Sequence, residues 1–221
     1  MRMACFVYDE SVELARIATL LQPYANLAPE QLESISTYID LILKWNQRIN
    51  LTAIRDREEI VTRHFGESFF AAAQWLVRGQ NEHVIDIGSG AGFPGLPLAM
   101  YGASTTVTLI ESQGKKATFL NEVIFALRLR NAKIFHGRAE QFEIQGDLVT
   151  LRAVEKFESV LPVAAALVRT GGRMGLMIGA AQVPRVLSSL GTVEWGKPMQ
   201  VPGAHARVLL IGTKTVNVEE K

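Results

Sequence analysis

The sequence predicts an α/β fold: a mostly parallel sheet with an antiparallel last strand, preceded by an N-terminal helical extension. Over residues 9–78 the apolar residues recur with helical spacing, as at Leu32, Ile35 and Ile39. From residue 83 onward, short apolar runs alternate with helix-like segments, which is the pattern of a parallel sheet covered on both faces. We therefore expect a helical extension over residues 1–80 and an α/β domain over residues 81–221.

The expected elements follow in chain order. One helix begins near Pro29, which suits a first helical turn, and ends near Arg48; a second runs from about Arg57 to Trp75. We expect strands at residues 83–88, 106–110, 132–135, 148–154 and 173–178. We expect helices at residues 95–101, 114–127, 157–169 and 182–190. The two last apolar segments, 194–201 and 206–211, are joined by a gap too short for a helical crossover, so they should pair antiparallel.

Composition excludes several classes of protein. Lys and Arg number 23 against 22 Asp and Glu, which excludes a polycation but not a local basic face. Cys5 is the only cysteine, so no internal disulfide forms and a reducing cytosol is indicated. The apolar stretch 161–168 is too short to cross a membrane, and no Cys/His cluster has metal-ligand spacing. We expect a cytoplasmic monomer that uses no metal and no membrane.

A glycine-rich loop follows the first strand. Asp86 lies near the strand's end, and Gly88, Gly90 and Gly92 alternate after it, which lets the backbone approach a ligand closely. In open α/β sheets, ligands bind at the carboxyl ends of the strands. Phe93 occupies the third glycine of the dinucleotide fingerprint, and no phosphate-cradling P-loop occurs. The loop instead looks like the first motif of S-adenosylmethionine-dependent methyltransferases.

Two further strand ends carry candidate cofactor contacts. Glu111 ends the second strand, where a carboxylate can accept hydrogen bonds from both ribose hydroxyls of an adenosine. The alternative is a carboxylate that caps the next helix. After the third strand, the amide of Ala139 could touch an adenine edge beside Glu140, or these residues could form a plain helix N-terminus.

Several motifs, taken in order, resemble one family. They are Lys44-Trp45-Asn46, Ile49-Asn50-Leu51-Thr52, Arg55-Asp56, Arg63-His64, the loop Gly88 to Leu98 with Pro94-Gly95-Leu96-Pro97-Leu98, Glu111-Ser112, Gly114-Lys115-Lys116, Phe119-Leu120, Arg138-Ala139-Glu140 and Arg152-Ala153. The set is similar to the ribosomal RNA small subunit methyltransferase G (glucose-inhibited division protein B) family over about residues 35–180. The resemblance implies a class I methyltransferase fold that moves a methyl group from S-adenosylmethionine to N7 of one guanine in 16S rRNA.

The resemblance also implies site residues. By motif it assigns cofactor contacts to Gly88, Phe93, Ala139, Glu140 and Arg152. The general methyltransferase pattern adds Asp86, Gly90 and Glu111. Two positions depart from the family: Glu67 stands where the family has Asp after Arg-His, and Ile178 stands where it has Lys. If that lysine holds RNA, another residue must replace it.

The implied chemistry needs no general base, because guanine N7 carries a lone pair and no proton. The main task is alignment of N7, methyl and sulfur, so we expect no catalytic acid or base. We interpret Arg152 as positioning cofactor or nucleotide, or alternatively as an arginine paired with a carboxylate. In paired RNA the major groove is too narrow for access, so the base must lie in a loop or be flipped out. Phe93 could stack on it, or could be an apolar plug; His64 and Trp45 are interpreted as structural.

Basic residues outnumber acidic ones between Leu41 and Phe65 and between Glu111 and Glu140. The candidates for RNA binding are Lys44, Arg48, Arg55, Arg63, Lys115 and Lys116; the alternative is a solvated face. The modest charge favours a protein-bearing small ribosomal subunit over naked RNA as substrate. Two other functions remain open, namely a methyltransferase acting on a small molecule or protein and a non-catalytic nucleoside-binding module.

Overall fold

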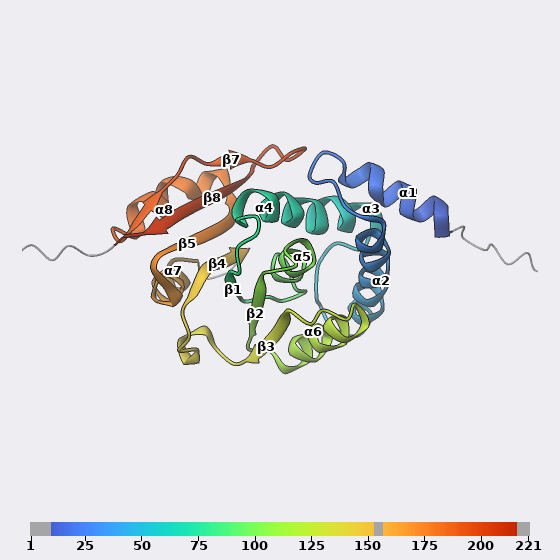
Figure 1. Ribbon diagram of the computed structural model, residues 1–221, viewed down its shortest axis with the longest axis horizontal. Coiled ribbons are helices and arrows are strands. Elements are labelled where there is room, and N and C mark those ends of the chain that lie inside the picture. The colour runs from blue at the N-terminus through green and yellow to red at the C-terminus, as the bar shows by residue number, and fades with distance from the viewer. Residues whose placement is uncertain (1–9, 153–156, 216–221) are drawn as a thin grey trace, which may run out of the picture.

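The computed structural model describes residues 10–152 and 157–215 (Figure 1). Its N-terminal elements are α1 (Glu10–Leu21), α2 (Pro29–Asn46), α3 (Arg57–Ile60), the π-helical turn η1 (Val61–Gly66) and α4 (Glu67–Trp75). Pro29 opens α2 as predicted, and the Asp56 side chain caps α3 by accepting a hydrogen bond from the Glu59 amide at 2.8 Å. The predicted helix from Arg57 to Trp75 is confirmed as one helical path, but a π turn that the sequence did not predict interrupts it.

One mixed sheet forms the body of the molecule. Its strands are β1 (His83–Ile87), β2 (Thr106–Glu111), β3 (Ala132–His136), β4 (Gly146–Arg152), β5 (Val168–Gly179), β6 (Val193–Trp195), β7 (Met199–Gln200) and β8 (Arg207–Lys214). The order along the sheet is β3-β2-β1-β4-β5-β8-β6, and β7 pairs with β8. The first five strands are parallel, whereas β8 is antiparallel to β5, β6 and β7. The predicted mostly parallel sheet with an antiparallel last strand is therefore confirmed.

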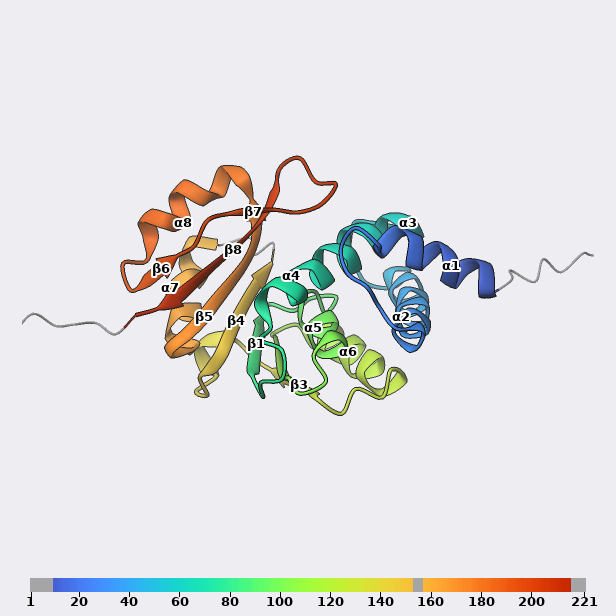
Figure 2. The same ribbon diagram turned by 45° about the horizontal axis from the view of Figure 1, so that its top comes forward.

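Helices cover both faces of this sheet. The later helical elements are α5 (Gly95–Tyr101), α6 (Gly114–Ala126), the 3-10 turn η2 (Ala139–Gln141), α7 (Phe157–Leu167), the 3-10 turn η3 (Ala180–Gln182) and α8 (Val183–Ser189). Figure 2 shows α7 and α8 on one side of the sheet and α4, α5 and α6 on the other. This arrangement explains why the central strands β1, β2 and β4 are buried almost throughout.

Two predicted elements have different boundaries in the structure, and the end of a third lies in residues that the structure does not describe. The helix expected to reach Arg169 ends at Leu167, because Val168 already pairs with Gly146 as the first residue of β5. The segment 194–201 is two short strands, since Pro198 lies between them and has no amide hydrogen to donate to the ladder. The last two residues of the expected strand 148–154 lie outside the described residues.

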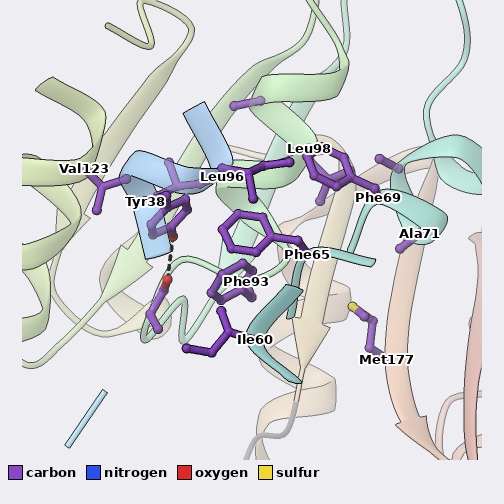
Figure 3. Close-up of a cluster of buried hydrophobic side chains, with 14 of the residues drawn as sticks. Tyr38, Ile60, Phe65, Phe69, Ala71, Phe93, Leu96, Leu98, Val123 and Met177 are labelled. Atoms are coloured by element: carbon purple, nitrogen blue, oxygen red, sulfur yellow. Dashed lines mark hydrogen bonds between the residues drawn. The ribbon is translucent and has the colours of Figure 1, made fainter. Parts of the chain in front are cut away.

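The hydrophobic core has two parts, one on each face of the sheet. One part joins β5 and β8 to α7, for example through Leu161, Leu176 and Leu210. The other joins the N-terminal helices to α5 and α6, and its centre is drawn in Figure 3, where Tyr38, Phe65, Phe93 and Leu96 lie together. This second part runs across residue 80 without interruption, so the first helices and the glycine loop share buried neighbours. The domain boundary at residue 80 stays a prediction.

Candidate functional site

The glycine loop turns through left-handed backbone conformations. Gly88, Gly90 and Gly92 have φ values of +67°, +58° and +88°, which L side chains rarely adopt. The amides of Gly88 and Ser89 both donate to the Ile110 carbonyl, at 2.9 and 3.1 Å, and so fix the loop to the end of β2. A Cβ on Gly92 would overlap the Tyr38 hydroxyl, whereas a Cβ on Gly88 would meet nothing within 4 Å. The loop is therefore packed on one side and open at Gly88.

Glu111 holds the loop from the neighbouring strand. One carboxylate oxygen accepts a hydrogen bond from the Gly90 amide at 2.9 Å, and the other accepts one from the Gln113 amide at 2.7 Å. Gln113 is the N-cap residue of α6, so Glu111 also holds the start of the next helix. This is the alternative role that the sequence left open for it. An ionised carboxylate has about four acceptor positions. Two of these have no partner among the described residues, and the residue is 4% exposed.

The Asp86 carboxylate lies inside the protein rather than in an open pocket. It accepts hydrogen bonds from the Thr150 hydroxyl at 2.8 Å and from the Gly95 amide at 3.3 Å. Burial raises the pKa of Asp86 to about 6, although the hydrogen bonds from Thr150 and Gly95 oppose the rise. Asp86 thus ties β1 to β4 and to the start of α5, and thereby fixes both ends of the glycine loop.

A pocket of about 230 Å³ opens where β1, β2 and β3 end. It is lined by Ile87, Gly88, Ile110, Ser112, Gly137, Arg138, Ala139, Glu140, Val160 and Val163. Three predicted cofactor residues therefore meet here, namely Gly88, Ala139 and Glu140. The sequence reasoning missed the apolar lining from Val160 and Val163, whose helical spacing predicted a helix but not the face that turns toward the pocket.

Phe93 is part of the core and does not line this pocket. Its ring stacks on His64, with centroids 4.8 Å apart, and on Tyr38 at 5.4 Å, and it meets Phe65 edge-on at 5.0 Å. The residue is only 6% exposed, so no free ring face remains for a flipped base. Of the two roles that the sequence left open for Phe93, base stacking or an apolar plug, this packing fits the apolar plug. Figure 3 shows the neighbouring anchor of the loop, in which the buried Tyr38 hydroxyl donates to the Ala91 carbonyl at 2.5 Å.

Arg152, at the end of β4, is paired with Glu67. Its guanidinium donates to the Glu67 carboxylate at 3.1 Å, to the Arg63 carbonyl at 2.6 Å and to the Ser68 hydroxyl at 3.4 Å. Burial lowers the pKa of the Arg152 guanidinium; the charge of Glu67 opposes this, and those of Arg207 and Arg63 add to it. The predicted alternative, an arginine paired with a carboxylate, is what the structure contains.

Glu67 itself joins two distant strands. It is 4% exposed in its side chain and also accepts a hydrogen bond from Nε of Arg207, at 2.6 Å. The residue before it, Gly66, leaves room for the Tyr24 ring, because a Cβ there would lie 2.8 Å from two ring carbons. Sequence reasoning noted Glu67 as a departure but missed Arg207, which lies 140 positions away.

His64 is a partly buried, hydrogen-bonded histidine, as interpreted from the sequence. Its Nε2 lies 2.8 Å from the Thr52 hydroxyl. Burial lowers the pKa of His64 to about 3, and the charges of Arg152 and Arg63 add to this effect, so the ring is neutral near pH 7. Its role is to support Phe93 and the segment around Thr52.

The model of the rRNA small subunit methyltransferase G family matches residues 31–191. The chain is 39% identical over 215 residues to the ribosomal RNA small subunit methyltransferase G of Roseiflexus castenholzii, covering 91% of this chain and 90% of that one. The chain belongs to the rRNA small subunit methyltransferase G family. The member from Chloroflexus aggregans is also 39% identical, with 85% of this chain and 84% of that one covered.

Solved structures show that this family member has the class I methyltransferase fold. It is similar to magnesium protoporphyrin IX methyltransferase from Synechocystis PCC 6803 with bound SAM, with a TM-score of 0.61, 13% identity and coverage of 80% and 97%. It is also similar to a ribosomal protein L11 methylase from Lactobacillus delbrueckii subsp. bulgaricus, with a TM-score of 0.59, 14% identity and coverage of 70% and 79%. Such low identities establish the fold alone.

The six predicted RNA-binding residues of this family member differ in their surroundings. Lys44 bridges Glu122 at 3.0 Å, Arg63 bridges Glu59 at 2.9 Å, and Arg55 donates to the Thr52 carbonyl. The other three are Arg48, which is exposed in the turn after α2, and Lys115 and Lys116 in the first turn of α6. These residues lie on at least two separate elements.

Within residues 10–152 and 157–215, no three His, Cys, Asp or Glu side chains are grouped so that they could hold a metal ion. Among the helices that the structure describes, none combines the length and apolar character needed to cross a membrane.

Proposed function

We propose that this member of the family transfers a methyl group from S-adenosylmethionine to N7 of one guanine in 16S rRNA of the small ribosomal subunit. The observation that carries the proposal is the open pocket beside the glycine loop, in a chain that the family model matches over residues 31–191. The proposal includes a protein-bearing subunit as substrate and a monomeric enzyme acting in the cytoplasm.

The residues at this pocket fit the nucleoside part of the cofactor. Gly88 lines the pocket, and because it has no Cβ it leaves space for close approach of the ligand to the backbone. Glu111 lies outside the pocket lining, but it has two acceptor positions without a partner in the described residues, which would suit the two ribose hydroxyls. Ile87, Ile110 and Val160 offer apolar surface to an adenine ring, with the amide of Ala139 at its edge. We assign cofactor contacts to Gly88, Gly90, Glu111, Ala139 and Glu140. Asp86, Phe93 and Arg152 act through the loop and the strand ends that they hold.

The chemistry then depends on alignment. When bound, S-adenosylmethionine supplies an electrophilic methyl group on a sulfonium. Guanine N7 needs no base, so the protein contributes by holding the glycine loop in one conformation through Tyr38, Asp86 and Glu111. The guanine becomes cationic on methylation, and negative charge close to it favours that change.

The test is transfer of a labelled methyl group to small subunits that lack their own N7 modification, followed by cleavage at N7-methylguanine. We expect one labelled guanine, and faster transfer to subunits than to naked 16S RNA. Cofactor binding without transfer to any RNA would overturn the proposed substrate and favour the non-catalytic module. Transfer to a small molecule or protein instead would favour the other alternative.

A further inference from the structure

We propose that Arg207 binds a phosphate group of the RNA substrate and that buried Glu67 fixes its orientation for this purpose. The inference rests on the proposed function and names a contact to the same substrate. Arg207 lies outside residues 31–191, the segment that the family model matches.

The fold brings Arg207 to the edge of the sheet where ligands bind. It is the first residue of β8 and pairs with Gly179, the last residue of β5, in the antiparallel ladder. Arg152 is the last residue of the adjacent strand β4. Because the carboxyl ends of parallel strands form one edge, Arg207 and Arg152 both lie at the edge that carries the glycine loop. Three strand spacings separate β8 from β1, or about 14 Å.

The guanidinium of Arg207 is held by one nitrogen only. Nε donates to Oε1 of Glu67 at 2.6 Å, and Oε2 of the same carboxylate accepts from Arg152 at 3.1 Å. The Arg207 side chain is 37% exposed, and in the described part of the chain its two Nη nitrogens have no hydrogen-bond partner and are not buried. A guanidinium is a rigid planar fork. Anchoring Nε therefore presents the two Nη groups in a fixed orientation, which suits bidentate binding of a phosphate.

Arg207 is a solvent-exposed member of a cluster of charged side chains. Three guanidinium groups, those of Arg63, Arg152 and Arg207, lie near one another, and Glu67 is shared between two of them. Arg63 also bridges Glu59, but its Nε is buried without a partner. The carboxylates of Glu67 and Glu59 pair with these guanidinium groups, and the charge of Asp86 also acts on Arg152. Of the two arginines that Glu67 pairs with, Arg207 has the more exposed side chain, 37% against 15% for Arg152.

The test compares Arg207→Gln with Arg169→Gln. Arg169 is a matched control, because its Nε also donates to one carboxylate, Oδ1 of Asp147 at 2.5 Å, and its side chain is 53% exposed. It lies at the start of β5, which is the opposite edge of the sheet. Methyl transfer to small subunits is measured at several salt concentrations, and S-adenosylmethionine affinity is measured by calorimetry.

We expect Arg207→Gln to raise KM for the subunit about 10-fold with little change in kcat. It should also reduce the salt slope of subunit binding by about one unit, the value for one phosphate contact. Arg169→Gln should change neither, and both variants should bind S-adenosylmethionine like the wild type. Arg207→Lys keeps the charge but loses the fork, so its KM should lie between the two.

Three results would separate the possible failures. Equal KM and equal salt slope for the Arg207 and Arg169 variants would overturn the inference. Weaker S-adenosylmethionine binding by Arg207→Gln would also overturn it, since the bound anion would then be the cofactor's carboxylate. If the wild type methylates no subunit, the proposed function fails, and filter binding of 16S RNA fragments by the same variants then decides the phosphate contact. Thermal unfolding checks the fold; if the Gln variant unfolds, the Lys variant carries the comparison.

Discussion

Replacing Tyr38 by Phe should destabilise the protein by removing a single oxygen atom. The Tyr38 side chain is fully buried, and its hydroxyl donates to the Ala91 carbonyl of the glycine loop at 2.5 Å. Burial raises the pKa of this hydroxyl well above its ordinary value, so it stays protonated and remains a donor. The ring contacts with Phe93 and Phe65 are kept in the variant, because Phe has the same ring. The loss is therefore confined to one hydrogen bond.

The expected magnitude follows from the carbonyl that is left behind. A buried acceptor without a partner costs about 1–3 kcal/mol. Urea unfolding of Tyr38→Phe should show this loss with an unchanged m value. Tyr101→Phe is the control, because Tyr101 is half-buried and its hydroxyl has no hydrogen bond within the described residues. If the two variants differ by less than about 0.5 kcal/mol, the hydroxyl does not anchor the loop and the reasoning fails.

Three further predictions concern the same loop. Glu111→Ala should weaken S-adenosylmethionine binding by about 1–3 kcal/mol in calorimetry, and unchanged affinity would exclude its ribose contact. Gly92→Ala should lower the free energy of unfolding clearly more than Gly79→Ala. Both glycines have positive φ, but only at Gly92 would a Cβ overlap neighbouring side chains. Equal losses in urea unfolding would show that the loop can shift to accept the Cβ. The pKa of Asp86 in the folded state is raised to about 6. The folded state therefore binds more protons than the unfolded state between about pH 4 and 6, so the contribution of Asp86 to stability falls as pH rises through that range. Asp86→Asn should remove this fall, which amounts to about 3 kcal/mol at most, and a wild-type-minus-variant difference that stays constant from pH 4 to 7 would contradict the assignment.

Local patterns in the sequence predicted the sheet and much of the site. Alternating apolar runs gave the strand positions, and the glycines at 88, 90 and 92 placed the loop, because both signals depend on neighbouring residues alone. The pairing of side chains that are distant in sequence could not be predicted in this way. The neighbours of Phe93 come from positions 38 and 64, and a phenylalanine beside a loop is compatible with a core residue or a ligand contact.

The same limit applies to the arginine cluster. Glu67 and Arg207 meet only because β8 runs antiparallel to β5 and begins at the edge where α4 also begins. Nothing in the residues around position 207 indicates this, and the family resemblance ended before it. The π turn at Val61–Gly66 was missed for a different reason: apolar residues continue with helical spacing on both sides of Gly66, so the spacing predicted an unbroken helix.

The core shared by the N-terminal helices and the glycine loop also has a consequence for synthesis. Helices α1 to α4 leave the ribosome first, but the buried partners of Tyr38 include Phe93 and Phe119, which are made later. The part of the apolar face of α2 that packs on Phe93 and Phe119 therefore stays unburied until translation has passed into α6. A nascent chain halted before that point should be a client for holding chaperones, whereas one that has reached the end of α6 should need them less.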